Sequence, residues 1–178
     1  MATPIQADDL PASAWIARFA PLVPAGPVLD LAAGRGRHSV LMRGLGHEVV
    51  AVDRDPSALA ARALPGIAAV AEDLEAGATP ACLARRYAGV VVTNYLHRPL
   101  FDAIRACLQP GGMLVYETFM AGNERFGKPS NPRFLLAPGE LWQAFGDWRV
   151  LGFAQGFVAD PKPAMIQRLV AVAGAFPR

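Results

Sequence analysis

The hydrophobic positions of this chain fall into short runs that alternate with stretches of helical periodicity. The runs are apolar on both faces and lack the polar alternation of a half-exposed strand. They predict strands at Val28–Leu31, Val49–Asp53, Ile67–Val70, Val90–Asn94 and Met113–Glu117. Helices are expected between them, near 37–45, 56–63, 80–86 and 100–108. Strands buried on both faces and separated by helices are typical of a parallel sheet covered on both sides, so the pattern predicts a doubly wound α/β fold.

The two ends of the chain follow a different pattern. Residues 1–25 are rich in Pro and Ala and read as an N-terminal arm with one short helix near 12–19. Residues 118–138 combine Gly and Pro without a clear period, which indicates a long loop that could serve as a substrate lid. A helix is expected near 138–145. The last two apolar runs, 148–158 and 164–173, are joined too closely for a crossover helix and predict an antiparallel hairpin.

Composition places the chain among single-domain globular proteins. Its 178 residues are 53% hydrophobic and 18% charged, so we expect one domain spanning 1–178 with a substantial core. No apolar run approaches the roughly 18 to 20 residues that cross a bilayer. The first ten residues lack the features of a secretory signal, so we expect a cytoplasmic protein without membrane contact. Cys82 and Cys107 show no metal-ligand spacing; we expect two core thiols and no metal site.

Arginine dominates the positive charge. The chain has 17 basic and 15 acidic residues, and only Lys128 and Lys162 of the basic ones are lysines. The arginines are scattered and form no run longer than Arg85-Arg86, whereas a phosphate-tracking surface usually concentrates its charge. A nucleic-acid partner is therefore possible but not favoured.

A glycine-rich turn follows the first predicted strand. Gly34 and Gly36 allow a positive φ and a close backbone approach to a ligand, although strand-to-helix turns also use glycine for structural reasons alone. Asp53 ends the second strand 19 residues after Gly34, where a carboxylate can bind a ribose diol. Asp73, with Glu72 as its rival, ends the third. Polar groups at three strand ends predict a nucleoside pocket; the alternative for Asp53 is a loop or capping acid.

These residues resemble the class I S-adenosylmethionine-dependent methyltransferases. The resemblance rests on VLDLAAGRGRHS, VDRD, AEDLE and VVTNYLHRPL, in that order, and is nearest to small bacterial stand-alone enzymes similar to the tellurite-resistance type. It implies a Rossmann-like, seven-stranded, mostly parallel sheet with an antiparallel C-terminal hairpin. It also implies S-adenosylmethionine as cofactor, and the residues that would hold the cofactor are Asp30, Ala32, Gly34, Gly36, Asp53, Asp73, Leu74 and Asn94. Ala32 stands where the family has glycine.

The segment after the fourth strand and the end of the fifth carry the candidate chemistry. Methyl transfer from a sulfonium mainly requires alignment, and a base is needed only when the nucleophile arrives protonated. We expect catalytic roles for Tyr95, His97 and Glu117, which should lie near the transferred methyl. The alternatives are a surface or capping role for His97, and for Glu117 an ion pair with Arg98 or Arg133. His38, at the start of the first helix, is expected to support the site rather than act as a base.

The same region and the loop after it supply candidate substrate contacts, namely Arg98, Asn123 and Arg133. For the loop residues a solvated surface remains the alternative. We expect a small-molecule acceptor, because no separate recognition domain remains. An RNA methyltransferase and a non-catalytic S-adenosylmethionine-binding scaffold are the competing functions. A nicotinamide-dependent oxidoreductase is disfavoured because the turn reads GRGRHS rather than GxGxxG. The acceptor, the methylated atom and the oligomeric state stay open.

Overall fold

The computed structural model of this chain describes residues 11–174. The first ten residues, in which no secretory signal is expected, lie outside the described residues. Seven strands form one sheet in the order β3-β2-β1-β4-β5-β7-β6. The strands are β1 (Val28–Leu31), β2 (Val49–Asp53), β3 (Ile67–Ala71), β4 (Tyr87–Thr93), β5 (Leu108–Phe119), β6 (Arg149–Val158) and β7 (Ala164–Val172). The α-helices are α1 (Ala14–Phe19), α2 (Arg37–Gly44), α3 (Ser57–Ala60), α4 (Phe101–Cys107) and α5 (Glu140–Phe145).

The strand pairing confirms the predicted fold class. β1 pairs in parallel with β2 and β4, and the parallel ladder continues through β3 on one side and β5 on the other. β7 then runs antiparallel between β5 and β6, which forms the predicted C-terminal hairpin. The strand order reverses between β1 and β4. In sheets of this kind, ligands bind outside the carboxyl ends of the strands at that point.

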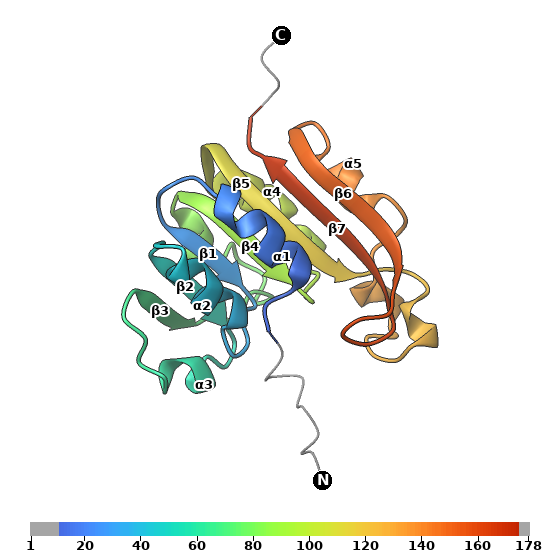
Figure 1. The fold of residues 1–178 in the computed structure, drawn as a ribbon, viewed down its shortest axis with the longest axis horizontal. Coiled ribbons are helices and arrows are strands. Elements are labelled where there is room, and N and C mark those ends of the chain that lie inside the picture. Colours follow the sequence, from blue (N-terminus) through green and yellow to red (C-terminus); the bar gives the residue numbers. More distant parts are fainter. Residues whose placement is uncertain (1–10, 175–178) are drawn as a thin grey trace.

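Helices cover both faces of the sheet (Figure 1). α1 and α2 lie on the near face, and α4 and α5 lie behind it. Alternating side chains of one strand serve the two layers, as Val91 joins the core under α1 and α2 while Val90 and Val92 join the larger core on the other face. This alternation explains why each predicted strand is apolar on both faces. Cys82 and Cys107 are both buried in the larger core.

The connection between β3 and β4 differs from its predicted form. The segment expected as a helix near 80–86 is a short 3₁₀ turn, Ala81–Ala84. The Glu72 carboxylate accepts hydrogen bonds from the backbone amides of Ala81 and Cys82, and this cap satisfies the amides of a turn too short to be a helix. The turn leads into β4, which begins at Tyr87, earlier than predicted.

The segment expected as a lid is an ordered loop with two 3₁₀ turns, Asn123–Arg125 and Pro132–Phe134. Buried Asn123 holds it from inside, since its side chain donates to the Pro129 carbonyl and accepts from the Met165 amide. The lid function stays a prediction. Within residues 11–174, no helix is long and apolar enough to cross a membrane.

Candidate active site

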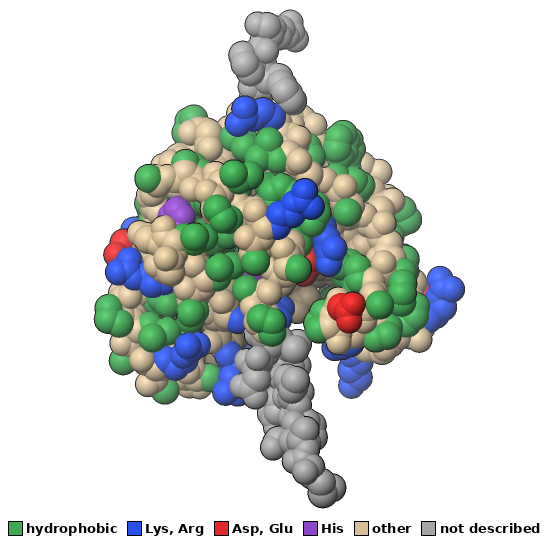
Figure 2. Space-filling view, viewed as in Figure 1, with side chains coloured by type: hydrophobic (Ala, Val, Ile, Leu, Met, Phe, Trp, Pro, Cys, Tyr) green, Lys and Arg blue, Asp and Glu red, His purple; other side chains and the backbone are tan. Residues whose placement is uncertain are grey.

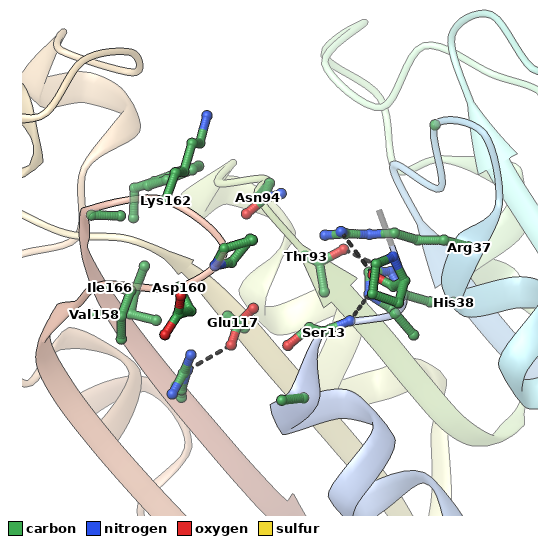
Figure 3. Close-up of a pocket in the computed structure, with 18 of the residues that line it drawn as sticks. Ser13, Arg37, His38, Thr93, Asn94, Glu117, Val158, Asp160, Lys162 and Ile166 are labelled. Atoms are coloured by element: carbon green, nitrogen blue, oxygen red, sulfur yellow. Dashed lines mark hydrogen bonds and ion pairs between the residues drawn. The ribbon is translucent and has the colours of Figure 1, made fainter. Parts of the chain in front are cut away.

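A cavity of about 540 Å³ lies at the carboxyl ends of β1, β4 and β5. The glycine turn and the start of α2 form one wall, and the end of β6, the hairpin turn and β7 form the opposite wall (Figure 3). Residues 11–14, which lead into α1, complete the lining. A pocket of roughly 300 to 1,000 Å³ is the usual size for a small-molecule or cofactor site. The cavity thus lies where the strand order predicts a ligand.

The glycine turn shapes the first wall through three positive φ angles. Ala32 has a φ of 55°, Gly34 also has 55°, and Gly36 has 79°. A Cβ on Gly36 would lie 2.5 Å from the Leu59 side chain, whereas a Cβ on Gly34 would meet nothing within 4 Å. Gly36 is therefore required for packing against α3, and Gly34 leaves open space beside the turn. Ala32 adopts the left-handed conformation that glycine adopts without strain.

Asp53 ties this turn to the end of β2. Its Oδ2 accepts a hydrogen bond from the Gly34 amide at 2.8 Å, and its Oδ1 accepts one from the Asp55 amide at 3.1 Å. The carboxylate is half-buried, and it is not part of the lining formed by the described residues. Two backbone donors hold it in place at the end of its strand, where acceptor lone pairs remain for a further donor.

Asp73 and Leu74 lie further along the same edge of the sheet, after β3. Asp73 is exposed and its Oδ1 accepts a hydrogen bond from the Glu75 amide at 2.9 Å, while Leu74 is buried in the core. Neither belongs to the described lining of the cavity. Their predicted contact with adenine stays a prediction, on the open surface next to Asp53.

Asp30 is a fully buried carboxyl group in β1. The Ser39 hydroxyl donates to its Oδ2 at 2.6 Å, and its Oδ1 has no hydrogen-bond partner among the described residues. Burial raises the pKa of Asp30 to about 6, against the lowering effect of the Ser39 hydrogen bond. Asp30 lies outside the described lining and supports the turn from behind, through α2.

His38 connects three parts of the cavity wall. Its Nε2 accepts a hydrogen bond from the Ser13 amide at 3.1 Å, and its Nδ1 lies 3.1 Å from Oγ1 of Thr93. Because an amide can only donate, Nδ1 carries the proton and donates to Thr93. Burial and the nearby Arg37 lower the pKa of His38 to about 3. The ring is a neutral connector between the N-terminal segment and β4.

Thr93, Glu117 and Arg168 form a row across β4, β5 and β7. The register pairs Thr93 with Glu117 and Glu117 with Arg168, so all three side chains lie on the sheet face that α1 and α2 cover. Arg168 Nε donates to Glu117 Oε2 at 2.6 Å, and the Arg168 guanidinium lies 5.7 Å from the centre of the Trp15 ring. Glu117 is only 7% exposed, yet it lines the cavity. Its partner is thus Arg168, not Arg98 or Arg133.

Four of the predicted site residues line the cavity, namely Ala32, Gly34, Asn94 and Glu117. Asn94 has a φ of 54°, and its amide donates to the Glu117 carbonyl at 2.9 Å. This bond joins the end of β4 to β5 and sets the exposed Asn94 side chain at the mouth of the cavity.

Tyr95 and His97 follow β4 but do not belong to the described lining. Nδ1 of His97 lies 3.9 Å from the Glu75 carboxylate. Burial and the Glu75 and Asp73 carboxylates raise the pKa of Tyr95. The catalytic roles of both residues stay predictions.

Arg98 makes its contacts with the loop that follows β5. Its guanidinium pairs with both carboxylate oxygens of Glu140, at 2.5 and 2.9 Å, and donates to the carbonyls of Arg133 and Leu135. These bonds anchor the predicted lid to the segment after β4. Arg98, Arg133 and Asn123 are not part of the lining formed by residues 11–174, and their predicted substrate contacts stay predictions.

The cavity also contains residues that the sequence analysis did not assign to it. They include Ser13, Arg35, Arg37, His38, Thr93, Asp160, Lys162, Ile166 and Arg168. Thr93 and Arg168 could be found only by aligning β4, β5 and β7 in register. The 158–168 residues enter because the hairpin turn reaches over the end of β5, which no local pattern indicates.

The sequence profile of the methyltransferase domain family matches residues 6–174. This chain belongs to that family. The match covers nearly the whole chain and confirms the predicted enzyme class, a methyltransferase. A sequence comparison with curated proteins finds no significant match.

Several solved structures share the fold, among them two that are named as methyltransferases. TehB from Haemophilus influenzae superposes with a TM-score of 0.72 at 19% identity, over 89% of this chain and 61% of TehB. The glycopeptide N-methyltransferase MtfA, complexed with S-adenosylmethionine, superposes with a TM-score of 0.60 at 23% identity, over 96% of this chain and 99% of MtfA. The 1,6-didemethyltoxoflavin-N1-methyltransferase of Burkholderia thailandensis superposes with a TM-score of 0.62 at 19% identity, over 91% of this chain and 79% of that enzyme. This methyltransferase thus spans about three fifths of the TehB chain that it matches.

Proposed function

We propose that this methyltransferase transfers the methyl group of S-adenosylmethionine to a small-molecule acceptor. The observation that carries the proposal is the cavity at the reversal of strand order, with the Gly34 turn on one side and Glu117 on the other. Family membership supports the reaction class. The fold neighbours complexed with S-adenosylmethionine, or named for small acceptors such as 1,6-didemethyltoxoflavin, support the cofactor and the acceptor class.

The residues present fit this cofactor. The turn at 32–36 leaves open space at Gly34, where the methionine portion can approach the backbone amides, and Arg37 in the same wall offers a positive charge to its carboxylate. Asp53 would accept the ribose hydroxyls, while Asp73 and Leu74 would contact the adenine. Asn94 would lie beside the sulfonium. No phosphate-binding arrangement is needed, because the ligand carries a cation in place of a pyrophosphate.

Bound S-adenosylmethionine supplies a methyl group already activated by the positive charge on sulfur. The chain's part is to align an electron pair of the acceptor with that methyl and to exclude water. Apolar side chains of the second wall, Phe119, Val158 and Ile166, are suited to both tasks. Glu117 and Thr93 supply polar contacts at the floor.

The experiment that tests the function is a calorimetric titration of ligand-free protein with S-adenosylmethionine, S-adenosylhomocysteine and NAD. We expect micromolar binding of both adenosyl ligands and none of NAD. Asp53→Ala should weaken the binding free energy of both adenosyl ligands by about 1.5 to 3 kcal/mol, the contribution of a charge-assisted hydrogen bond. Asp102→Asn, on the exposed side of α4, is the matched control and should bind normally. A protein that binds neither adenosyl ligand would refute the proposal.

An RNA acceptor is the second function in the same class. On the face drawn in Figure 2, Lys and Arg side chains are scattered and form no continuous patch. A salt series separates the two acceptors, because RNA binding weakens steeply as salt rises. The non-catalytic scaffold is distinguished by binding of S-adenosylmethionine without turnover. We also propose that the chain forms a single domain and acts in the cytoplasm.

A further inference from the structure

We propose that the acceptor nucleophile is a nitrogen that bears an N–H, and that Glu117 binds this N–H beside the transferred methyl group. The inference rests on the proposed function, which it deepens by naming the atom that is methylated. It follows from the row of Thr93, Glu117 and Arg168, and from the hydrogen bonds and positions of other polar side chains that line the cavity.

Glu117 is placed to contact the acceptor. It lies two residues before the end of β5, opposite Thr93, and its backbone carbonyl accepts the hydrogen bond of the Asn94 amide at 2.9 Å, so it lies beside the segment expected at the sulfonium. In Figure 3 its carboxylate points into the cavity between the two walls. Arg168 occupies Oε2. The other carboxylate oxygen, Oε1, accepts no hydrogen bond from the described residues and is available to a donor on the acceptor.

The ion pair with Arg168 decides what this carboxylate can do. Nε of Arg168 donates to it at 2.6 Å, and the Arg168 side chain is 24% exposed, so the pair is largely shielded from water. A carboxylate held by a guanidinium accepts hydrogen bonds and balances positive charge, but it gives up that partner if it takes a proton. Glu117 is therefore suited to hold a donor, and it is poorly suited to remove a proton from one.

In the lining formed by residues 11–174, neither His38 nor Asp160 is placed to serve as a base for a hydroxyl acceptor. His38 is occupied at both ring nitrogens, since Nε2 accepts from Ser13 and Nδ1 donates to Thr93. Asp160 is an exposed carboxylate at the rim. Ordinary carboxyl groups titrate near about 4 and phenols near about 10, so a carboxylate is a weak base toward a hydroxyl. A nitrogen of low basicity, such as that of an aromatic amine or a heterocycle, needs no base before it reacts, because at neutral pH it is uncharged and carries a lone pair.

The charges balance in the transfer to nitrogen. The nitrogen lone pair forms the new N–C bond while the C–S bond breaks, and the electron pair of that bond stays on sulfur. The positive charge moves from sulfur to the methylated nitrogen, whose N–H then lies against Glu117. The proton leaves to water with the released product. Glu117 stabilises the charge that develops on nitrogen, as an oppositely charged group does in a shielded site.

The hydroxyl of Thr93 adds a second contact. It accepts the Nδ1 proton of His38, so its own proton is free to be donated into the cavity. The row therefore offers one acceptor, at Glu117, next to one donor, at Thr93. An acceptor whose N–H is close to a carbonyl or another lone pair matches both.

The test uses three adenosyl ligands and needs no knowledge of the natural acceptor. Sinefungin carries an amino group on carbon in place of the methyl-bearing sulfonium, so it places an N–H donor at the methyl position. S-adenosylmethionine has the positive charge without that N–H, and S-adenosylhomocysteine has neither. Calorimetric affinities of all three are measured for the wild type and for Glu117→Gln. Glu48→Gln is the matched control, because Glu48 is also paired with an arginine, Arg43, far from the cavity.

We expect Glu117→Gln to weaken sinefungin by at least about tenfold, as the loss of one charge-assisted hydrogen bond implies. The affinity for S-adenosylmethionine should fall clearly less, and the affinity for S-adenosylhomocysteine should not change. Glu48→Gln should bind all three ligands with wild-type affinity. Equal weakening of sinefungin and S-adenosylmethionine would make Glu117 a counter-charge for sulfonium and overturn the inference. Unchanged sinefungin affinity would overturn it as well.

Absence of ligand binding by the wild type and misfolding of the variant have separate meanings. If the wild type binds none of the three ligands, the proposed function itself fails, irrespective of Glu117. If Glu117→Gln does not fold because Arg168 is left unpaired, the double variant Glu117→Gln/Arg168→Gln removes both charges together. This variant is expected to show the same selective loss of sinefungin affinity, and retention of wild-type selectivity would overturn the inference.

Discussion

The ring of His38 joins Ser13 to Thr93, and by these two hydrogen bonds it holds the N-terminal segment against the end of β4. The contact with Thr93 spans 55 positions of the chain, and the contact with Ser13 spans 25. A buried side chain with two such bonds fixes the shape of the cavity wall as well as contributing to stability.

Replacement of His38 by alanine should release this wall. Loss of a buried ring and two hydrogen bonds is expected to lower the free energy of unfolding by about 2 to 4 kcal/mol, measured by urea denaturation. Hydrogen exchange at the Ser13 amide should accelerate in the same variant. His97→Ala is the control, since His97 is half-buried and its Nδ1 lies 3.9 Å from the Glu75 carboxylate, beyond hydrogen-bond distance. Unchanged exchange at Ser13 in His38→Ala would show that the segment is held by other contacts.

The parts of this site that could be predicted from sequence are those with local signals. The turn with Gly34 and Gly36 after an apolar strand, and Asp53 at the end of the next one, are predictable from the alternation of elements alone. Gly34 lies in the described lining of the cavity, whereas the cofactor contacts of Gly36 and Asp53 stay predictions. Glu117 is predictable for the same reason, because it ends the apolar run of the fifth predicted strand, and it does line the cavity. The two-faced apolar runs made the sheet predictable, and its hairpin followed from a connection too short for a helix.

The contacts that could not be predicted join distant positions through ordinary residue types. His38 looks like any residue in the first turn of a helix, and nothing local connects it with Thr93. The partner of Arg98, Glu140, lies 42 positions later. The partner of Glu117, Arg168, becomes apparent only when β7 is placed between β5 and β6. Such pairs depend on register and on loop paths, which carry no periodic signal.

Ala32 provides a test of backbone strain at the cofactor turn. Its φ of 55° is in the left-handed region, where a Cβ costs about 1 to 2 kcal/mol. Ala32→Gly should raise the free energy of unfolding by up to about 1 kcal/mol, since the added backbone entropy of glycine offsets part of the gain. Ala33→Gly, next to it and without a positive φ, should instead lower the free energy of unfolding. Destabilisation by both variants would disprove the strain at Ala32.

Asp30 predicts a pH dependence with a defined sign. The pKa of its carboxyl group is about 6 in the folded protein and 3.8 in its ordinary state, so the folded protein retains a proton that the unfolded chain has lost. The free energy of unfolding should therefore fall as the pH rises from about 4 to about 7, by about 3 kcal/mol for this group.

The variant Asp30→Asn isolates that contribution. The amide is similar in shape to the protonated carboxyl group and can keep its contact with Ser39. Urea denaturation of ligand-free protein at several pH values should show a smaller fall for the variant than for the wild type over this window. Parallel pH profiles would contradict a raised pKa at Asp30.

Arg98 offers a test between an anchor and a substrate contact. Arg98→Lys keeps the charge but cannot pair with both oxygens of Glu140 while reaching the carbonyls of Arg133 and Leu135. We expect a loss of about 1 to 2 kcal/mol in the free energy of unfolding and faster hydrogen exchange over 133–140, with unchanged binding of S-adenosylmethionine.

The control for this measurement is Arg62→Lys, an exposed arginine after α3 that should leave exchange over 133–140 unchanged. Normal stability and exchange in Arg98→Lys, together with impaired methyl transfer, would instead assign Arg98 to the substrate.

The two facing walls of the cavity come from separate parts of the chain. The wall expected to hold the cofactor is built from residues before Asn94. The opposite wall is built from Glu117 onward and includes the hairpin. We therefore expect that exchange of 117–168 with the same segment of a relative would change the acceptor and leave cofactor binding intact. Changes in the two segments should therefore have separable effects, on cofactor affinity in one case and on the choice of acceptor in the other.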